Sequence, residues 1–211
     1  MEPVRLIEGR AVPLDRHDVD TDQIIPSDWL KRVERTGFGR GLFSQWRDDQ
    51  DFILNHPNYV GATILLAGER FGTGSSREHA VWALMDHGFC AVVASSFGDI
   101  FKNNATKSGL VTVQLTASQL AELMELVRRE PACSIVIDVQ DATIEVAQHS
   151  WLVHFDMLAA TRERLLNGWD DVGLTMRNES QITEYEQAHN QIVSSVTTFQ
   201  DSQRRVLHSD G

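Results

Sequence analysis

Short, uninterrupted apolar runs alternate with helical periodicities in the first half of the chain. Such runs are typical of strands buried on both faces, because a parallel sheet is covered by helices on each side. Three segments have this pattern: 62–67, 90–95 and 110–115. The spacing of the residues between them predicts two helices, over 80–87 and 98–107, which end at Gly88 and Gly109.

The second half begins with a strong helix signal and continues with short alternating runs. Thr116 and Gln119 form a capping-box pair ahead of an apolar helical face. Alternation with period two then predicts three short strands joined by tight turns, at 135–139, 143–147 and 151–155. Asp156 is expected to cap a helix that runs to Gly168, and a last helix is expected over 179–189.

These elements predict an α/β domain over residues 1–189, with a mixed sheet, flanking helices and a small meander. Residues 4–14 alternate enough to add one or two strands at the start. The glycine-rich residues 37–41 are expected to form a mobile loop. From Asn190 the chain is polar and lacks periodicity, so residues 190–211 are expected to form a frayed tail.

Composition limits the class of function. Thirty acidic and 19 basic residues give a formal net charge of −11, without any run of Lys or Arg. Nucleic acids and anionic membranes require a cationic surface, so neither is an expected partner. The apolar runs are too short to cross a bilayer, and residues 1–10 lack the features of a signal peptide.

The two cysteines, Cys90 and Cys133, lie far apart in the sequence. Two such residues are too few for a disulfide framework, and too few to hold an iron–sulfur cluster or a zinc ion alone. No metal is therefore expected in this chain, and a reducing cytoplasm is the expected location.

One segment, residues 72–79 (GTGSSREH), combines the features of a binding site for an anion. It follows a predicted strand and opens a predicted helix, where free amides and the helix dipole favour negative charge. Gly74 lets a ligand approach the backbone, Ser75 and Ser76 add hydroxyls, and the planar fork of Arg77 matches a carboxylate. The alternative is an ordinary glycine turn, in which Ser76 caps the helix and Arg77 is solvated.

Common motifs for other ligands do not fit this segment. The dinucleotide fingerprint requires glycine where Arg77 stands, and a phosphate-binding P-loop requires Gly-Lys-Ser or Gly-Lys-Thr. The nucleophile elbow of hydrolases requires Gly-x-Ser-x-Gly, which residues 72–76 do not match. A carboxylate is therefore the expected ligand.

Three aspartates have the spacing that opens a calcium loop: Asp18, Asp20 and Asp22. The loop would then require Gly and Glu where Gln23 and Trp29 stand. We expect a turn whose carboxylates cap backbone amides rather than a metal site. His79 follows Ser75 by four positions, and one helix rarely brings such a pair into contact. His79 is therefore expected to be a helix residue, or one that supports the residues in contact with the ligand.

Four segments together resemble the small subunits of 3-isopropylmalate dehydratase, which are relatives of the swivelling C-terminal domain of aconitase. These segments are 13–43, 55–84, 95–110 and 167–175. The resemblance extends over residues 4–189 and implies a β/β/α swivel domain. It also implies that 2-isopropylmalate is dehydrated to 2-isopropylmaleate and rehydrated to 3-isopropylmalate, a step of leucine biosynthesis.

The resemblance implies roles for individual residues. Ser75 matches the serine whose alkoxide removes the carbon-bound proton, and Gly74, Ser76 and Arg77 match the turn that binds a substrate carboxylate. A loop that recognises the variable side group of the substrate is matched by Trp29, Leu30 and Lys31. The implied partner is a large subunit that holds a 4Fe-4S cluster, so no cofactor is expected in this chain itself.

Departures from the family leave alternatives open. Arg70 and Thr73 stand where the family usually has Asn and Cys. A sister hydro-lyase for citraconate, dimethylmalate or a homologated malate would share the turn and differ at residues 27–36. A non-catalytic carboxylate-binding module is a second alternative, against which the intact Ser-Ser-Arg triplet argues, and a serine hydrolase is a third.

Overall fold

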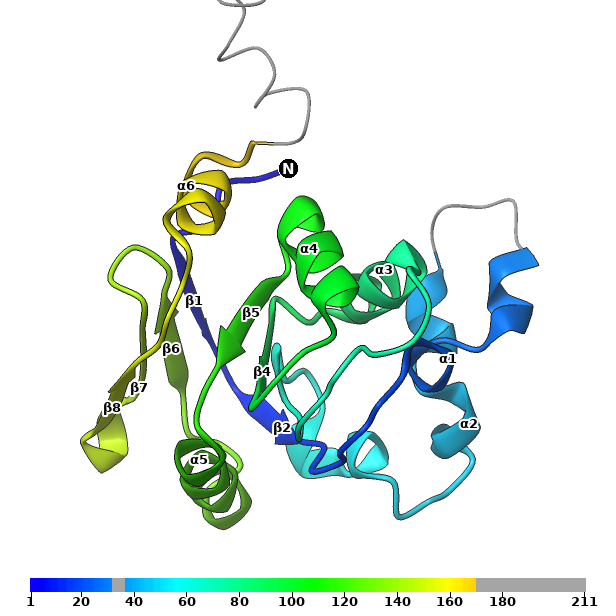
Figure 1. The fold of residues 1–211 in the computed structure, drawn as a ribbon. Helices are drawn as coiled ribbons and strands as arrows, with labels where there is room; N and C mark the ends of the chain where they lie inside the picture. Colours follow the sequence, from blue (N-terminus) through cyan, green and yellow to red (C-terminus); the bar gives the residue numbers. More distant parts are fainter. Residues whose placement is uncertain (32–36, 170–211) are drawn as a thin grey trace, which may run out of the picture. The chain divides into compact units, whose positions relative to one another are not determined.

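The computed structural model describes residues 1–31 and 37–169 (Figure 1). These residues belong to one compact unit, Met1–Asp170. The helix predicted over 179–189 and the tail predicted over 190–211 lie outside the described residues. Within the described part, no helix is long and apolar enough to cross a membrane.

One four-stranded sheet is parallel and has the candidate site at the carboxyl end of one strand. In spatial order, its strands are β2 (Ala11–Pro13), β3 (Ile64–Leu66), β4 (Ala91–Ala94) and β5 (Val111–Gln114). Every residue of β3 and β4 is buried, as the apolar runs predict. The crossovers contain α3 (Glu78–His87) and α4 (Asp99–Ser108), which end at left-handed Gly88 and Gly109, as predicted.

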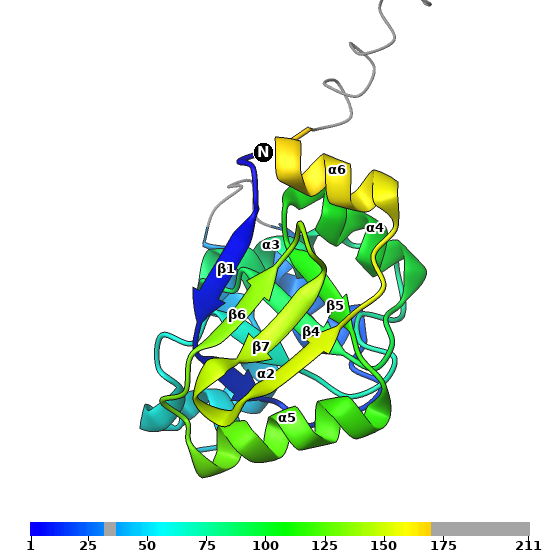
Figure 2. The ribbon, with the colours of Figure 1, turned by 90° about the vertical axis from the view of Figure 1, so that its left-hand side faces the viewer.

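The second four-stranded sheet is antiparallel. Its strands, again in spatial order, are β1 (Leu6–Gly9), β6 (Ile135–Asp138), β7 (Thr143–Val146) and β8 (Trp151–His154). Buried and partly exposed residues alternate along β6 and β7, so one face of the sheet packs inward. Figure 2 shows this sheet from the front, with α5 (Ala117–Arg129) below it and α6 (Ala159–Asn167) above.

The chain changes sheet at a single residue, because only Arg10 separates β1 from β2. Parallel and antiparallel strands therefore lie in two sheets rather than in one mixed sheet. Ile7 and Ile137 of the antiparallel sheet share a core with Ile64 of the parallel sheet. A second core joins the other face of the parallel sheet to α3 and α4. These layers confirm the α/β class and the β/β/α order that the resemblance implies.

Short helical turns build most of the connection from β2 to β3. They are α1 (Thr21–Ile24), η1 (Ser27–Lys31), η2 (Phe38–Gly41), α2 (Ser44–Arg47), η3 (Ile53–Asn55) and η4 (Pro57–Tyr59). One more 3-10 turn, η5 (Ala147–His149), precedes β8. The predicted capping box of Thr116 and Gln119 opens α5.

The prediction of a mobile loop over residues 37–41 is wrong. Phe38–Gly41 form the 3-10 turn η2, which packs against α3, and Phe38 is buried. The amide of Gly39 donates to Asp86 Oδ2 at 2.7 Å. A Cβ at Gly39 would lie 2.8 Å from the backbone nitrogen of His87. Glycine here permits the close approach of two backbones rather than mobility.

The prediction that Asp156 caps the last described helix is also wrong. Helix α6 begins at Ala159, its N-cap is Leu158, and no side chain caps it. Phe155 still pairs with the antiparallel sheet, because its amide donates to the carbonyl of Ala142 at 2.9 Å. The chain therefore leaves the sheet over the next residues before the helix can begin. The predicted end at Gly168 is confirmed.

Candidate functional site

The Ser-Ser-Arg triplet lies between the carboxyl end of β3 and the start of α3. In α/β proteins, this edge of a parallel sheet is where ligands commonly bind. Gly72 and Gly74 have φ of +75° and +101°, a left-handed conformation that favours glycine. A Cβ at Gly72 would lie 2.3 Å from Phe101 Cγ. Glycine at this position therefore lets the turn pack directly on α4.

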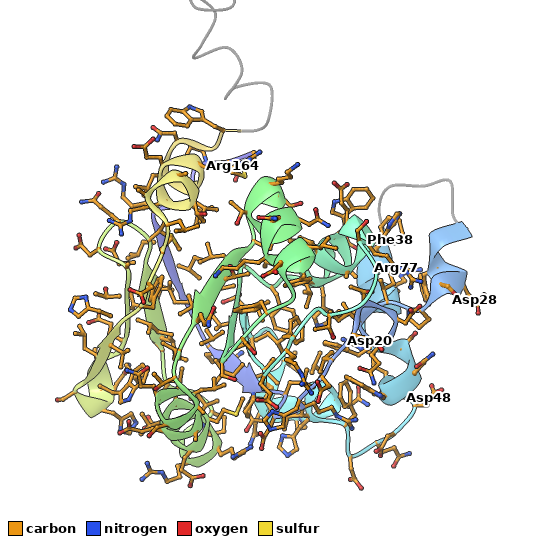
Figure 3. The ribbon with its side chains drawn as sticks, in the orientation of Figure 1. Asp20, Asp28, Phe38, Asp48, Arg77 and Arg164 are labelled. Atoms are coloured by element: carbon orange, nitrogen blue, oxygen red, sulfur yellow. The ribbon has the colours of Figure 1, made fainter. Side chains whose placement is uncertain are left out.

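A second segment, residues 18–22, runs alongside the turn. The amide of Gly72 donates to the carbonyl of Val19 at 2.7 Å, and the amide of Thr21 donates to the carbonyl of Thr73 at 2.9 Å. Figure 3 shows Arg77 near the start of α3 with Asp20 on the neighbouring segment. The candidate site is therefore built by two segments that are far apart in the sequence.

The two serines of the turn are exposed. Ser75 Oγ lies 3.3 Å from Thr21 Oγ1, and Thr21 is only 2% exposed. The carbonyl of Ser75 accepts a hydrogen bond from the amide of Arg77 at 2.8 Å. Ser75 is thus the outer member of a pair of hydroxyls whose inner member is buried.

The guanidinium of Arg77 forms an ion pair with Asp22, through Nη1 and Oδ1. The Arg77 side chain is 22% exposed and that of Asp22 is 56% exposed. Arg77 is also the N-cap of α3 and makes no capping hydrogen bond with its side chain. An anion at the turn would therefore meet both a guanidinium and the positive end of a helix, which suits a carboxylate. The alternative of a solvated Arg77 and a capping Ser76 does not describe this arrangement.

The three aspartates of segment 18–22 have three different partners. Asp20 Oδ1 accepts a hydrogen bond from the amide of Gln23 at 2.8 Å, in a complete capping box at the start of α1. Asp18 pairs with Arg70, and Asp22 pairs with the arginine of the turn. The predicted capping role is confirmed for Asp20, whereas the other two aspartates bind arginines.

The cysteines do not form a site for an iron–sulfur cluster. Cys90 is exposed, whereas Cys133 is 2% exposed in the core between the sheets. Burial raises the pKa of the Cys133 thiol, which disfavours the thiolate that a metal requires. Residues 1–31 and 37–169 contain no group of three or more His, Cys, Asp and Glu that could hold a metal ion. These donors do not fit a 4Fe-4S cluster.

The segment that resembles a specificity loop starts in η1, which contains Trp29, Leu30 and Lys31. The Trp29 indole is half-buried against the second core. A Cβ at Gly41 would lie 2.5 Å from Trp29 Cδ2, so the ring packs directly on this glycine. Trp29 therefore contributes to packing. Contact of these residues with a substrate stays a prediction.

Two residues that flank the turn, Thr73 and His79, act through the backbone and through packing. Thr73, which stands where the family usually has Cys, forms a parallel bridge with Asp20. The His79 ring lies 4.7 Å from that of Trp82 and 5.3 Å from that of Phe38, between centroids. His79 is therefore a helix residue in an aromatic cluster, as predicted.

The sequence pattern predicts no site role for Thr21 and a capping role for Asp22. The structure places Thr21 beside Ser75, and Asp22 beside Arg77. No periodicity connects the two segments, because their contact depends on the order of strands in the parallel sheet. The Asp-Thr-Asp sequence in the first segment that resembles the family was the available signal.

The turn itself is an open surface. A groove of about 970 Å³ lies at the carboxyl ends of β4 and β5, and its lining includes Ser95, Lys102 and Asp156. The serines of the turn and Arg77 are not among its lining residues. Since Gly74, Ser75 and Ser76 are exposed, the part of the chain that the structure describes does not enclose a ligand at the turn.

The fold and the turn define a known class of domain. Residues 1–118 match the family described as the Aconitase C-terminal domain. Residues 171–191 match the family described as the C-terminal domain of the 3-isopropylmalate dehydratase small subunit. The first match covers more than half of the chain and includes both segments of the candidate site.

Individual relatives narrow this class. The 3-isopropylmalate dehydratase small subunit of Rubrobacter xylanophilus is 54% identical over 188 residues, which cover 89% of this chain and 95% of the relative. That of Frankia casuarinae is 55% identical over 186 residues, covering 88% and 94%. A crystal structure of 3-isopropylmalate dehydratase from Methanocaldococcus jannaschii, 27% identical, matches with a TM-score of 0.64 and covers 85% of this chain and 99% of that chain. The chain belongs to the family of 3-isopropylmalate dehydratase small subunits, which confirms the resemblance noted in its sequence.

Proposed function

We propose that this chain is the small subunit of a 3-isopropylmalate dehydratase and acts only together with a large subunit. The complex would convert 2-isopropylmalate into 3-isopropylmalate through 2-isopropylmaleate, in leucine biosynthesis in the cytoplasm. The observation that carries this proposal is the turn Gly74–Arg77. It joins two exposed hydroxyls, a helix N-terminus and a guanidinium in a chain that is 54% identical to a relative of that name.

Ser75 is assigned the role of the base. In the dehydration step, its oxygen takes the carbon-bound proton, the C–H electron pair forms the double bond, and the hydroxyl group departs from the neighbouring carbon. In the rehydration step, Ser75 gives the proton to the carbon that lost the hydroxyl group, and hydroxide adds to the carbon that lost the proton, so the two groups exchange places. A serine oxygen is a strong base only as an alkoxide, which requires hydrogen bonds and positive charge nearby. Arg77 and the N-terminus of α3 supply that charge.

Gly74, Ser76 and Arg77 are assigned to a carboxylate of the substrate. Arg77 donates Nη1 to Asp22, and the edge formed by Nε and Nη2 has the spacing of two carboxylate oxygens. The hydroxyl of Ser76 can donate a further hydrogen bond. The loop that begins at Trp29, Leu30 and Lys31 is assigned to the isopropyl group of the substrate.

The exposure of the turn is the physical reason for a partner. An alkoxide is too basic to persist in contact with bulk water, and electrostatic stabilisation is strongest where water is excluded. Since Ser75 is exposed, another surface has to cover it. The 4Fe-4S cluster that the resemblance implies is assigned to that large subunit, because the donors described here do not fit it.

The test combines this chain with the 3-isopropylmalate dehydratase large subunit of the same organism, purified under anaerobic conditions. We expect each subunit alone to be inactive, and the mixture to elute as a complex that converts 2-isopropylmalate. Metal analysis of this chain alone is expected to find no stoichiometric iron. Turnover by this chain alone, or no turnover by a stable complex with intact cluster, would overturn the proposal.

A panel of acids tests the substrate separately. Citramalate, dimethylmalate and a homologated malate present the same reacting carbons with other side groups. We expect kcat/KM for 2-isopropylmalate to exceed that for each of the others by at least about tenfold, because a hydrophobic pocket distinguishes side groups of different size to this degree. A larger kcat/KM for another acid would identify a sister hydro-lyase and leave the role of Ser75 intact.

A further inference from the structure

Thr21 is a buried polar residue whose hydroxyl faces the proposed base. Its Oγ1 lies 3.3 Å from Ser75 Oγ and 3.4 Å from the carbonyl oxygen of Ser75. Among the described residues, the buried polar or charged side chains are those of Thr21 and Thr112. Burial of a hydroxyl costs free energy unless the hydroxyl is hydrogen-bonded, so the partners of Thr21 matter to the fold as well as to the site.

The backbone fixes this hydroxyl in place. Thr21 is the first residue of α1, behind the capping box of Asp20, and its amide donates to the carbonyl of Thr73 at 2.9 Å. A Cβ at Gly74 would lie 3.2 Å from Thr21 Oγ1, closer than most such contacts, and Gly74 has a φ of +101°. The chain therefore leaves just enough room at Gly74 for the Thr21 hydroxyl to reach Ser75.

A threonine hydroxyl has one proton to donate and two lone pairs that accept. When Ser75 is neutral, the Thr21 proton can go to the Ser75 carbonyl while Ser75 donates its own proton to Thr21. When Ser75 is an alkoxide, the Thr21 proton can turn to Ser75 Oγ instead. A hydrogen bond to an ionised acceptor is shorter and about twice as strong as a neutral one. The contact therefore favours the deprotonated serine, and its length in the neutral pair is typical of sites that tighten during reaction.

We propose that Thr21 is a positioning residue that orients Ser75 and stabilises its deprotonated form through the hydroxyl–hydroxyl contact. This inference rests on the proposed function, because it requires Ser75 to act as the base. It adds a donor from the N-terminal segment to those of the turn. Thr21 touches neither substrate nor cofactor and acts only through Ser75.

The test compares Thr21→Val with Thr21→Ser in the complex with the large subunit. Valine keeps the shape of the side chain and removes the hydroxyl, whereas serine keeps the hydroxyl and removes the methyl group. We expect Thr21→Val to lower kcat by about 10- to 100-fold, the range for one hydrogen bond to a charged group, with little change in KM. The limb on which kcat rises with pH should move to higher pH, because the alkoxide is harder to form. Thr21→Ser should keep both kcat and the pH profile close to those of the original protein.

Several results would overturn the role of Thr21. One is a Thr21→Val variant with unchanged kcat and an unchanged pH profile. Another is a fall in kcat that is equal in Thr21→Ser and Thr21→Val, with no shift of the pH profile in either variant. The folding of each variant is verified by circular dichroism and by its co-elution with the large subunit. If Thr21→Val does not fold, Thr21→Ala removes the hydroxyl without adding volume, and the same outcomes apply to it.

The double variant Thr21→Val/Ser75→Ala separates this inference from the proposed function. If Thr21 acts through Ser75, the valine substitution has no further effect on the residual rate once Ser75 is alanine. A further loss in that background would show that Thr21 acts elsewhere. Full activity of Ser75→Ala alone would instead refute the proposed base, and the role of Thr21 with it. An inactive Ser75→Ala beside an unaffected Thr21→Val would refute only the role of Thr21.

Discussion

Arg77 forms an ion pair with Asp22, which stands 55 positions earlier in the chain. The pair connects the turn before α3 to the first turn of α1. It engages one terminal nitrogen of the guanidinium and so orients the whole planar group. Asp22 therefore belongs to the proposed carboxylate-binding site, although it carries a negative charge itself, because it orients the arginine that would bind the substrate.

Asp22→Asn should weaken substrate binding without unfolding the protein. The Asp22 carboxylate is 56% exposed, so we expect the free energy of unfolding to change by less than about 1 kcal/mol. We expect KM to rise by about 3- to 10-fold, because Arg77 loses the charge that orients it. Steady-state kinetics of the complex measure this. Asp18→Asn breaks the neighbouring pair with Arg70 and is the matched control, so an equal rise in KM would contradict a specific role for Asp22.

Arg77→Lys should be far from conservative. Lysine keeps the charge but loses the planar fork, and with it one of the two hydrogen bonds to a carboxylate. Such bonds contribute about 1.5–3 kcal/mol, so kcat/KM should fall by roughly 10- to 100-fold. The measurement is kcat/KM of the reconstituted complex. Unaltered kinetics would show that Arg77 does not hold the substrate carboxylate.

Ser75→Ala should separate the base from the scaffold. Loss of a general base lowers kcat by about 10²- to 10⁴-fold, whereas removal of an exposed hydroxyl should change stability by no more than about 1–2 kcal/mol. Ser76→Ala is the matched variant and should act mainly on KM. Both are measured in the complex, with circular dichroism to verify the fold. If Ser75→Ala keeps more than about a tenth of the original kcat, another group takes the proton.

Gly72→Ala should be strongly destabilising. The new Cβ would meet the Phe101 ring at 2.3 Å, and the residue has a φ of +75°. Left-handed backbone costs an alanine about 1–2 kcal/mol, and overpacking adds about 1–3 kcal/mol. Gly88→Ala is the control, because Gly88 has a φ of +112° with nothing within 4 Å of its Cβ position. Urea denaturation should show a larger decrease in the free energy of unfolding for Gly72→Ala than for Gly88→Ala. Equal decreases would mean that α4 shifts to make room for the new Cβ.

Stability should depend on pH through His87, at the end of α3. Burial lowers the pKa of His87, Arg47 acts in the same direction, and Asp86 opposes them. The unfolded chain, with an ordinary pKa of about 6.5, then binds the proton more readily than the folded chain does. Stability should therefore fall as the pH drops through about 6.5, and level off below the folded pKa. Urea denaturation of the protein and of His87→Gln, measured at a series of pH values around about 6.5, tests the role of His87. The stability of the variant should no longer decrease in this way as the pH falls.

Local signals predicted the elements around the site well. The buried runs of β3 and β4, the capping box of α5 and the glycines that end α3 and α4 are each defined within a few residues. The chemistry of the Ser-Ser-Arg turn is equally local, so a preference for anions could be predicted from its residue types. The roles of the residues assigned to the turn stay predictions.

Long-range contacts were not readable in the same way. The change of sheet at Arg10, the packing of Gly39 on α3 and the meeting of Thr21 with Ser75 all join segments that no shared periodicity connects. The glycines of residues 37–41 illustrate the difficulty. Small residues are compatible with mobility and with close packing, and only the surrounding fold decides between the two.

The two-sheet arrangement has a consequence for how the chain is made. A nascent chain that ends after β5 already contains every residue assigned to the site, yet it lacks β6, β7 and β8. The parallel sheet would then present Ile64, Val93 and Val113 to water on the face that the meander later covers. During synthesis, the segment that contains the proposed site is thus complete before one face of its sheet is covered, and residues 135–154 bury that apolar face only after they have been made.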